Sequence, residues 1–412
     1  MVPILTPAET LARLQNRDNA SAAAVEVVGP ILDDVRARGD SALREWAQKL
    51  DGLGSAPLRV ESNCRSEALT QITPDLRSAL QAAAKNIRSF AEFQMPVEKE
   101  TELSPGLRVG QVIRPLETIG AYVPGGAYPL PSTLLMTVIP AQVAGVKNIC
   151  VANPRPAKET LAAAEVLGVE NFFRVGGAQA IAAFAFGTET VPKVDRIVGP
   201  GNVYVAAAKR LLAGEVAIDS IAGPSEVVIV ADEGDANYIA ADMLAQAEHD
   251  ADASSIFITT NRELAEKVQT GLSDRLETLS TKEIAGQSLR HNGAIVLTGS
   301  ISASMDLVNQ IAPEHLCLYD PTLVGQVLNA GSIFLGPNST ESLGDYATGP
   351  NHVLPTGGSA RSRGGLSVTD FVKVITFQQV DERALRELAG TVTTLARAEG
   401  LEAHARAVEA RL

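Results

Sequence analysis

The spacing of apolar residues predicts helices in the first hundred residues. Ser21–Arg38 and Asp75–Phe93 carry apolar residues three and four positions apart, with charged residues between them. This spacing is typical of amphipathic helices. A Thr-Pro-Asp sequence at 73–75 is a helix start signal for the second stretch. A Pro-Gly pair at 105–106 then marks a break, and short runs rich in strand formers follow it.

Two alternations of strand and helix occupy most of the remaining chain. The first predicts strands at Thr118–Val123, Asn148–Ala152, Phe172–Val175, Arg196–Val198 and Val227–Val230. Its predicted helices are Ser132–Val143, Lys158–Leu167, Ala178–Phe186 and Val203–Ala213. The second predicts helices at Asp235–Glu248, Glu263–Leu279 and Ser302–Gln310, and strands at Ser255–Thr259, Gly293–Leu297 and Ser332–Leu335. Strands separated by such helices favour right-handed βαβ units and parallel sheets, and Glu382–Leu412 adds a helical tail.

The composition narrows the class of protein. A length of 412 residues indicates two or more domains. The net charge of −13 argues against nucleic-acid binding, because no basic face is evident. Cys64, Cys150 and Cys317 are widely spaced without a CxxC motif, so we expect no disulfide framework and a cytoplasmic protein. We also expect neither a signal peptide nor a membrane span, since no suitable apolar stretch is present.

Two pairs of polar neighbours stand out around the histidines, of which the chain has five. Gln246 and His249 are three positions apart, so on a helix they would share a face and could bind one metal ion. Glu314 precedes His315 and follows a proline, which places two proton-transfer groups at one point. Each pair also has a structural interpretation: the first spacing is common by chance, and the second fits a helix cap on an exposed turn.

Another histidine lies in a segment rich in turn residues. Asp345 and His352 share the segment 344–356, where four Gly or Pro residues are interleaved with polar side chains. This pattern indicates a loop of fixed shape, and such loops often carry functional sites. By contrast, His291 stands in a polar turn, and we assign it no function.

The fifth histidine, His404, lies in the predicted helical tail together with Glu399. The two residues are five positions apart, so an ideal helix would point their side chains about 140° apart. Gly400 would loosen that turn. The alternative interpretation of His404 is a solvated helix face.

Glycine-rich turns punctuate the first alternation. They occupy residues 123–126, 175–179, 198–202 and 222–225, and three of them follow predicted strands and precede predicted helices. This arrangement places backbone N–H groups and a helix N-terminus near the phosphates of a ligand. The dinucleotide fingerprint GxGxxG is absent, however, and any single turn of this kind also fits a tight strand-to-helix connection.

Taken together, these segments resemble the histidinol dehydrogenase family from about residue 20 to the C-terminus. The motifs that carry the resemblance are YVPGG at 122–126, VGGAQAIAA at 175–183, VGPGN at 198–202, AGPSE at 222–226, QAEH at 246–249, APEHL at 312–316, GDYATGPNHVLPT at 344–356 and GLSV at 365–368. Each motif is short, but their number and order make coincidence a poor explanation.

The resemblance implies a role for each residue of a site. The implied ligands of one zinc ion per subunit are Gln246, His249, Asp345 and His404. The implied acid/base pair is Glu314 and His315. The implied substrate contacts are Ser225, Gln246, His249, His315, Asp345, His352, Glu399 and His404. The implied NAD contacts are Tyr122, Gln179 and Asn202.

The resemblance also implies a reaction and an assembly. The reaction is the oxidation of L-histidinol to L-histidine through bound L-histidinaldehyde with two NAD, the last step of histidine biosynthesis. The family works as a homodimer whose C-terminal segment reaches the partner's active site, so His404 and Glu399 would complete the neighbouring site. No nucleic acid or membrane partner is expected.

The fold implied by the resemblance is α/β, with two Rossmann-like parallel-sheet domains of incomplete dinucleotide-binding topology and small helical segments at both ends. Residues 19–113 together with 226–366 would form the first α/β domain, and residues 114–225 would form the second, which binds NAD. Residues 1–18 would be an N-terminal segment that packs with the tail. Residues 367–412 would be the C-terminal segment exchanged in the dimer.

Three other interpretations compete with this one. A paralogue could use the same zinc and hydride chemistry on another amino- or sulfo-substituted alcohol, but Glu399 and His352, which address the histidinol end, are both present. A zinc hydrolase would have no use for Tyr122, Gln179 and Asn202 together. A catalytically dead homologue would have lost part of the acid/base pair or a ligand, and none is lost.

Overall fold

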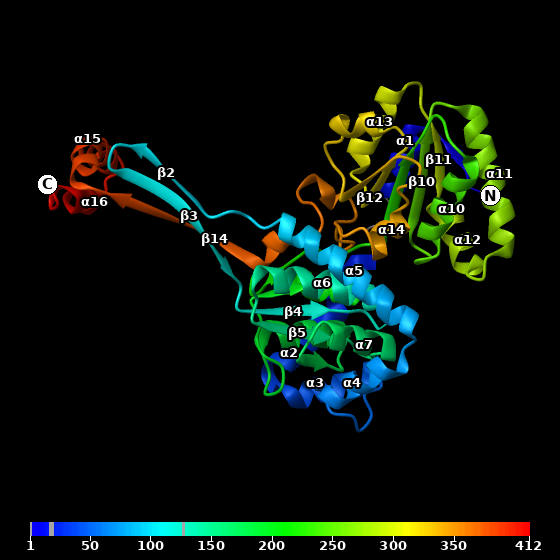
Figure 1. Ribbon diagram of the computed structural model, residues 1–412, viewed down its shortest axis with the longest axis horizontal. Helices are drawn as coiled ribbons and strands as arrows, with labels where there is room; N and C mark the ends of the chain where they lie inside the picture. Colours follow the sequence, from blue (N-terminus) through cyan, green and yellow to red (C-terminus); the bar gives the residue numbers. More distant parts are fainter. Residues whose placement is uncertain (1, 16–19, 126–127) are drawn as a thin grey trace.

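The computed structural model describes residues 2–15, 20–125 and 128–412 as two α/β lobes and a projecting arm (Figure 1). One lobe is built on a five-stranded sheet and the other on a six-stranded sheet, and both sheets are parallel. The arm carries a three-stranded antiparallel sheet. No helix of the described residues is long and apolar enough to cross a membrane.

The five-stranded lobe has the strand order β6-β5-β4-β7-β8. Its strands are β4 (Thr118–Tyr122), β5 (Asn148–Ala152), β6 (Asn171–Phe173), β7 (Arg196–Val198) and β8 (Ala217–Ile218). Its crossover helices are α6 (Pro131–Ala144), α7 (Lys158–Val166), α8 (Gly177–Phe186) and α9 (Val203–Leu212). The chain therefore crosses from one side of β4 to the other between β6 and β7, and such a reversal marks the usual ligand position of an open parallel sheet.

Further helices from the N-terminal part of the chain cover this same lobe. They are α2 (Ala20–Arg38), α3 (Asp40–Trp46), the π-helix η1 (Ala47–Asp51), α4 (Ser62–Gln71) and α5 (Pro74–Phe93). Val28 and Leu43 share a buried cluster with Phe184 of α8, and Leu80 of α5 shares another with Leu134 of α6. The expected grouping of residues 19–113 with 226–366 therefore differs from the packing within this chain, because the apolar faces of α2–α5 are buried against the five-stranded lobe.

The six-stranded lobe repeats the same strand order with one strand added at an edge, β1-β11-β10-β9-β12-β13. Its strands are β1 (Ile4–Leu5), β9 (Glu226–Val230), β10 (Ser254–Thr259), β11 (Ala294–Leu297), β12 (His315–Leu318) and β13 (Ser332–Leu335). Its helices are α1 (Pro7–Gln15), α10 (Ala236–Ala247), α11 (Arg262–Thr278), α12 (Lys282–His291), α13 (Ile301–Ile311), the 3₁₀ helix η2 (Pro321–Gln326) and α14 (Glu341–Tyr346). Every residue of β9 is buried, as expected for a central parallel strand covered on both faces. The fold class predicted from the sequence is confirmed.

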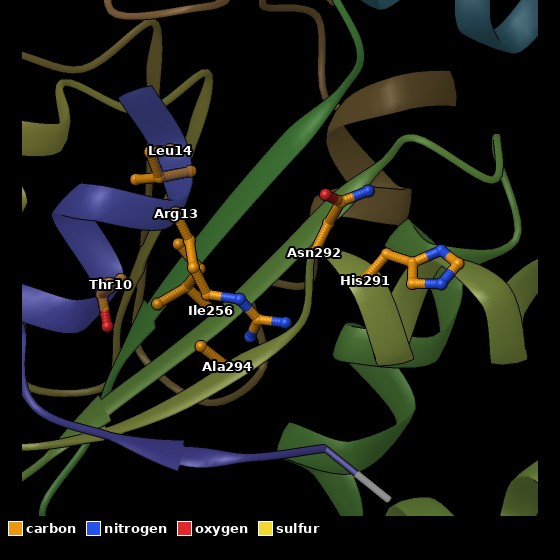
Figure 2. A pocket seen from close by; sticks show the side chains of 7 residues that line it. All are labelled: Thr10, Arg13, Leu14, Ile256, His291, Asn292 and Ala294. Carbon is orange, nitrogen blue, oxygen red and sulfur yellow. The ribbon is translucent and has the colours of Figure 1, made fainter. Parts of the chain in front are cut away.

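The N-terminal segment belongs to this second lobe. β1 pairs with β11, and Arg13 of α1 donates hydrogen bonds to the carbonyl oxygens of Arg290 and Gly293. Figure 2 shows the small pocket at this junction, which His291 also lines. Its volume of about 10 Å³ is no more than one water molecule needs, so we assign it no ligand. The expected contact of this segment with a tail stays a prediction.

The arm combines a hairpin from the first third of the chain with the C-terminal segment. It contains β2 (Lys99–Ser104), β3 (Leu107–Pro115), β14 (Val372–Val380), α15 (Glu382–Ala398) and α16 (Glu402–Glu409), and short 3₁₀ helices η3 (Ser359–Arg361) and η4 (Val368–Phe371) precede it. β14 runs antiparallel to β3 over nine residue pairs. In Figure 1 the arm extends well beyond the five-stranded lobe and carries the C-terminus at its far end.

Most predicted helices and strands are present within a residue or two, but several strands and the helices α12 and α14 were not predicted. The interruption at 105–106 is a hairpin turn between β2 and β3, with Gly106 at φ +84°. β12 and β14 were not predicted, and His291 ends helix α12 instead of standing in a polar turn. The edge strand β1 was also missed. β1 and β12 have two and four residues, too few to establish a pattern.

Candidate active site

Several residues of the expected site lie at the ends of strands in the two lobes. Glu226 and His315 begin β9 and β12, so they lie at the amino-terminal edge of the six-stranded sheet. Tyr122 ends β4, so it lies at the carboxyl-terminal edge of the five-stranded sheet. The segment that contains His352 connects the two lobes, since Asn351 Nδ2 donates to the carbonyl oxygen of Met136 in α6 at 2.6 Å.

The expected acid/base pair, Glu314 and His315, is buried at the start of β12. His315 Nδ1 lies 3.0 Å from the carbonyl oxygen of Glu226, and Glu314 Oε2 accepts a hydrogen bond from the backbone N–H of that residue at 2.8 Å. The carboxylate of Glu314 is 3.6 Å from His315 Nδ1. Both side chains are therefore anchored to the first residue of β9, which follows Ser225 directly. The exposed-turn interpretation of this pair is wrong.

The pKa values of both groups are raised, that of Glu314 by burial and that of His315 by nearby carboxylates. Removal from water raises the pKa of Glu314 to about 7, even though the neighbouring imidazole acts in the opposite direction. For His315, burial lowers the pKa, but the negative charge of Glu314 and the contact with Asp345 outweigh it and raise the pKa to about 10. Buried groups with pKa values perturbed in this way are typical of acid/base sites.

Asp345 links this pair to the QAEH segment. Its Oδ1 lies 3.6 Å from His315 Nε2, and its Oδ2 lies 3.9 Å from His249 Nε2. His249 follows the end of α10, and its N–H donates to the carbonyl oxygen of Gln246 at 3.3 Å, so the turn keeps the two residues close. The pKa of Asp345 is lowered, because the close contact with His315 and its charge outweigh the opposite effect of burial.

His352 reaches the same place from the 344–356 segment. Its Nδ1 lies 2.8 Å from the carbonyl oxygen of Asp345, and its Nε2 lies 3.4 Å from Thr133 Oγ1 at the start of α6. Burial lowers the pKa of this imidazole, so it is held neutral between the two lobes. The loop predicted here is present after Tyr346, whereas Asp345 lies in the short helix α14.

The donor set at this place fits a metal ion in part. Gln246 is buried, and its Nε2 has no hydrogen-bond partner among the described residues, as is also true of His315 Nε2. Gln246, His249 and Asp345 together offer nitrogen and oxygen donors of the kinds that zinc accepts. No group of three His, Cys, Asp or Glu side chains in the described part of the chain is placed to hold one metal. One expected ligand is therefore missing from this place.

The missing ligand, His404, lies on the arm. Glu399 caps the C-terminus of α15, Gly400 adopts φ +77°, and His404 lies in the first turn of α16. The sequence-based expectation that Gly400 loosens the turn is confirmed. The side chains of Glu399 and His404 are exposed, and Figure 1 places α15 and α16 far from α10, α14 and β12 of the same chain. Glu399 and His404 therefore cannot reach the residues of this site within one chain.

The three expected cofactor residues lie together at the carboxyl edge of the five-stranded sheet. The hydroxyl of Tyr122 accepts a hydrogen bond from the N–H of Gly177 at 3.1 Å, and burial raises the pKa of this phenol to about 12. Gln179 is fully buried and donates through Nε2 to Asp51 Oδ2 at 3.0 Å. Asn202 is exposed and caps α9 through its Oδ1. The glycine turns are thus shaped by buried side chains as well as by glycine.

Sequence reasoning overlooked one buried carboxyl beside the acid/base pair. Glu341 begins α14, and neither of its carboxylate oxygens has a hydrogen-bond partner among the described residues. Burial raises its pKa well above the usual value, and its charge in turn raises the pKa of His315. Nothing in the local sequence distinguishes it from an ordinary acidic residue in the first turn of a helix.

Comparisons with known proteins agree on one family. The family model for histidinol dehydrogenase matches residues 14–412. Histidinol dehydrogenases of Bacillus cereus and Deinococcus radiodurans are 50% and 47% identical, covering 93% and 99% of this chain and 91% and 95% of their own lengths. The crystal structure of histidinol dehydrogenase from Elizabethkingia anophelis has a TM-score of 0.91 at 39% identity, covering 94% of this chain and 91% of that one.

Proposed function

This chain belongs to the histidinol dehydrogenase family, and we propose that it oxidises L-histidinol to L-histidine with two NAD and one zinc ion per subunit. The observation that carries the proposal is the grouping of Glu314, His315 and Asp345 next to Gln246 and His249. One alcohol, one water and two NAD⁺ would yield one carboxylate, two NADH and three protons. The intermediate is L-histidinaldehyde, which stays bound between the two steps.

His315 is the proposed proton acceptor for the alcohol. Its Nδ1 faces the carbonyl oxygen of Glu226, which fixes the ring and leaves Nε2 as the reactive atom. Without substrate and zinc, the charges of the surrounding carboxylates raise the pKa of His315 and favour its protonated form. The positive charges of the cationic substrate and of a zinc ion would offset them and favour the neutral form that a base requires.

Glu314 is the proposed base for the second step. Its pKa of about 7 suits a carboxyl that must take a proton from water and release it again near neutral pH. The water so activated would add to the aldehyde carbon, and His315 would assist loss of the second hydride. Both groups are anchored to Glu226, so they keep one geometry through both steps.

The residues proposed to hold zinc are Gln246, His249, Asp345 and the partner subunit's His404. When bound, zinc would serve as a template that orients the amino and imidazole nitrogens of the substrate. Asp345 also contributes negative charge for the cationic substrate, and its backbone carbonyl positions His352 on the other side of the site. Ser225 and the partner subunit's Glu399 complete the proposed substrate contacts.

Tyr122, Gln179 and Asn202 are proposed to form the NAD site at the strand-order reversal between β4 and β7. When bound, NAD would accept a hydride in each of the two steps. Asn202 is the most accessible of the three, and its Nδ2 is available because Oδ1 caps α9. Tyr122 and Gln179 are buried and would act mainly by shaping the glycine turn at 176–177.

A second copy of this chain is the proposed partner. The arm exposes apolar side chains that a single chain leaves uncovered, among them Val374, Ile375 and Leu395. Burial of such a surface favours association. The same association would bring His404 and Glu399 to the active site of the neighbouring chain. That site has only three of the four proposed zinc ligands within its own chain.

One assay tests the proposed reaction. Purified zinc-loaded protein, incubated with limiting L-histidinol and excess NAD, is expected to form two NADH and one L-histidine per substrate. The NADH is measured by absorbance and the amino acid by chromatography. A yield of one NADH without histidine, or no NADH at all, would overturn the assignment.

A further inference from the structure

A buried ion pair lies outside the acid/base and metal residues. Lys209 of α9 and Asp219, just after β8, are joined by an Nζ–Oδ1 contact of 2.6 Å, and their side chains are only 2% and 1% exposed. Taking two charges out of water is costly, and a well-packed apolar pair is often at least as stable. Stability alone therefore does not explain why a charged pair, instead of an apolar one, occupies these buried positions.

Both members of the pair bind the same backbone unit. Lys209 Nζ donates to the carbonyl oxygen of Gly199 at 2.6 Å, and Asp219 Oδ2 accepts from the N–H of Gly199 at 2.7 Å. Asp219 Oδ1 also accepts from the N–H of Ser220 at 2.6 Å. The donor and the acceptor of one glycine are thus held from two directions by charged side chains, which form stronger hydrogen bonds than neutral groups.

The conformation of this glycine is unusual as well as tightly held. Gly199 has φ +109°, and a Cβ at this position would lie 2.1 Å from the carbonyl oxygen of Tyr122. The backbone therefore passes directly against the end of β4. A side chain here would force the turn away from the strand, so the close approach depends on glycine.

The turn lies where a ligand of this sheet is expected. β7 ends at Val198, and Asn202 begins α9 as its N-cap, so Gly199 starts the connection between them. β4 and β7 are neighbours at the point where the strand order reverses. The position of Asn202 relative to Tyr122 depends on the path of this short connection.

We propose that Lys209 and Asp219 are positioning residues for the dinucleotide: by holding both polar groups of Gly199, they fix the 199–202 turn in its binding conformation before the ligand arrives. This inference rests on the proposed NAD site. In this chain, which has no GxGxxG sequence, the buried Lys209–Asp219 pair would set the shape of the turn. The gain is in preorganisation, because a turn that is already ordered loses less entropy on binding.

The test compares NADH binding to the zinc-loaded dimer and to the neutral double variant Lys209→Met/Asp219→Asn. Replacing both partners avoids leaving one buried charge unpaired. We expect the dissociation constant for NADH, measured by fluorescence titration, to rise about 10- to 100-fold, as for other groups that orient a binding residue. Zinc content and the KM for L-histidinol are expected to stay near the wild-type values.

A matched control comes from a second polar network in the same lobe. Asp40 accepts hydrogen bonds from Thr188 Oγ1 at 2.6 Å and from the N–H of Thr190 at 3.2 Å. These threonines follow the C-terminal end of α8, whereas the 175–179 turn lies at its N-terminal end. The Asp40→Ala variant is expected to lower the thermal midpoint without weakening NADH binding. If the folded double variant binds NADH like the wild type, or if Asp40→Ala weakens binding equally, the proposal is wrong.

Hydrogen exchange on the wild-type protein gives an independent readout. The proposal expects slow exchange of the Gly199 N–H before ligand is added, with little further protection on adding NADH. Protection that appears only with NADH would overturn it, even if the double variant does not fold. If the wild type binds no NADH, the proposed function itself fails, and this inference fails with it.

Discussion

The imidazole Nε2 of His315 lies 3.6 Å from the carboxylate Oδ1 of Asp345, although one residue begins strand β12 and the other lies in helix α14. This contact joins the proposed proton-transfer group to a proposed metal ligand. A substitution of His315 therefore tests proton transfer alone only if Asp345 keeps its position, and the converse holds for a substitution of Asp345 and metal binding.

Replacing the imidazole is expected to remove catalysis while sparing metal binding. His315→Gln should lower kcat for NADH formation by about 10²- to 10⁴-fold, the usual contribution of a positioned acid or base. Zinc content, measured by elemental analysis, should stay near one ion per subunit. Glu314→Gln should slow oxidation of added L-histidinaldehyde more than oxidation of L-histidinol, because it removes the group that activates water.

The control for this prediction is His291→Ala, at the end of α12 beside the small N-terminal pocket. Its activity should stay within about twofold of the wild type, as for most substitutions outside a site. A His315→Gln enzyme that keeps more than about a tenth of wild-type kcat would exclude the proposed base.

Removing the carboxylate of Asp345 is expected to weaken metal binding. Asp345→Asn keeps the shape but loses one anionic donor, so zinc affinity should fall at least 10-fold, about the size seen even for outer groups of metal sites. A chelator should inactivate the wild type, and added Zn²⁺ should restore activity. Competition with a chromophoric chelator measures both affinities.

A nearby carboxyl serves as the matched control. Asp242 is also largely buried, and its Oδ1 accepts a hydrogen bond from Thr340 Oγ1 at 2.8 Å, but it is not a proposed ligand. Asp242→Asn should therefore keep the wild-type zinc affinity. Equal loss of zinc in both variants would point to a general disturbance around α14 instead of a lost ligand.

The parts of this fold that the sequence predicts well are local. Helix Asp75–Phe93 carries its own start signal, and Thr73 does accept a hydrogen bond from the N–H of Leu76. The glycine turns at 175–179 and 198–202 do connect strands to helices as expected. Each of these features depends on residues within one or two turns of chain, so the pattern and the structure share the same cause.

The parts that could not be predicted depend on distant contacts. β14 pairs with β3, whose residues lie far earlier in the chain, so neither strand shows its partner in the local pattern. The same holds for Asp51, which comes from η1 but holds the turn at Gly176 in the other half of the lobe. For the site, the motifs supply the candidate residues, but the distances between these residues and their burial follow from tertiary packing.

Asp51 also gives a prediction about pH and stability. Its Oδ2 accepts from the N–H of Gly176 at 2.9 Å and from Gln179 Nε2, but burial outweighs both bonds and raises its pKa. A carboxyl with a raised pKa in the folded state binds its proton more tightly there than in the unfolded chain. Its contribution to stability is therefore complete below the unfolded pKa of about 3.9 and is lost as the pH rises through the folded pKa.

The variant Asp51→Asn isolates this contribution, because Asn has a similar shape and does not ionise. The free energy of unfolding of the wild type, minus that of Asp51→Asn, should become more positive as the pH is lowered from about 8 towards 4. Urea titrations at several pH values measure this difference. A difference that stays constant, or that grows with rising pH, would contradict the raised pKa.

The proposed exchange of arms between two chains gives the sharpest prediction about the site. His404→Ala disables the tail and leaves the body intact, whereas His315→Ala disables the body and leaves the tail intact. If each tail serves the partner's body, a mixed dimer has one site with both residues intact and one site with neither. Each variant alone should be nearly inactive.

Unfolding and refolding an equal mixture of the two variants should restore about a quarter of wild-type activity, because half of the dimers are mixed and each has one intact site. The measurement is NADH formation before and after mixing, with each variant refolded alone as the control. If the tail served its own body, every site in the mixture would lack one residue, and no activity would return. Size-exclusion chromatography confirms that both variants still form dimers, so a negative result would count against the exchange and not against assembly.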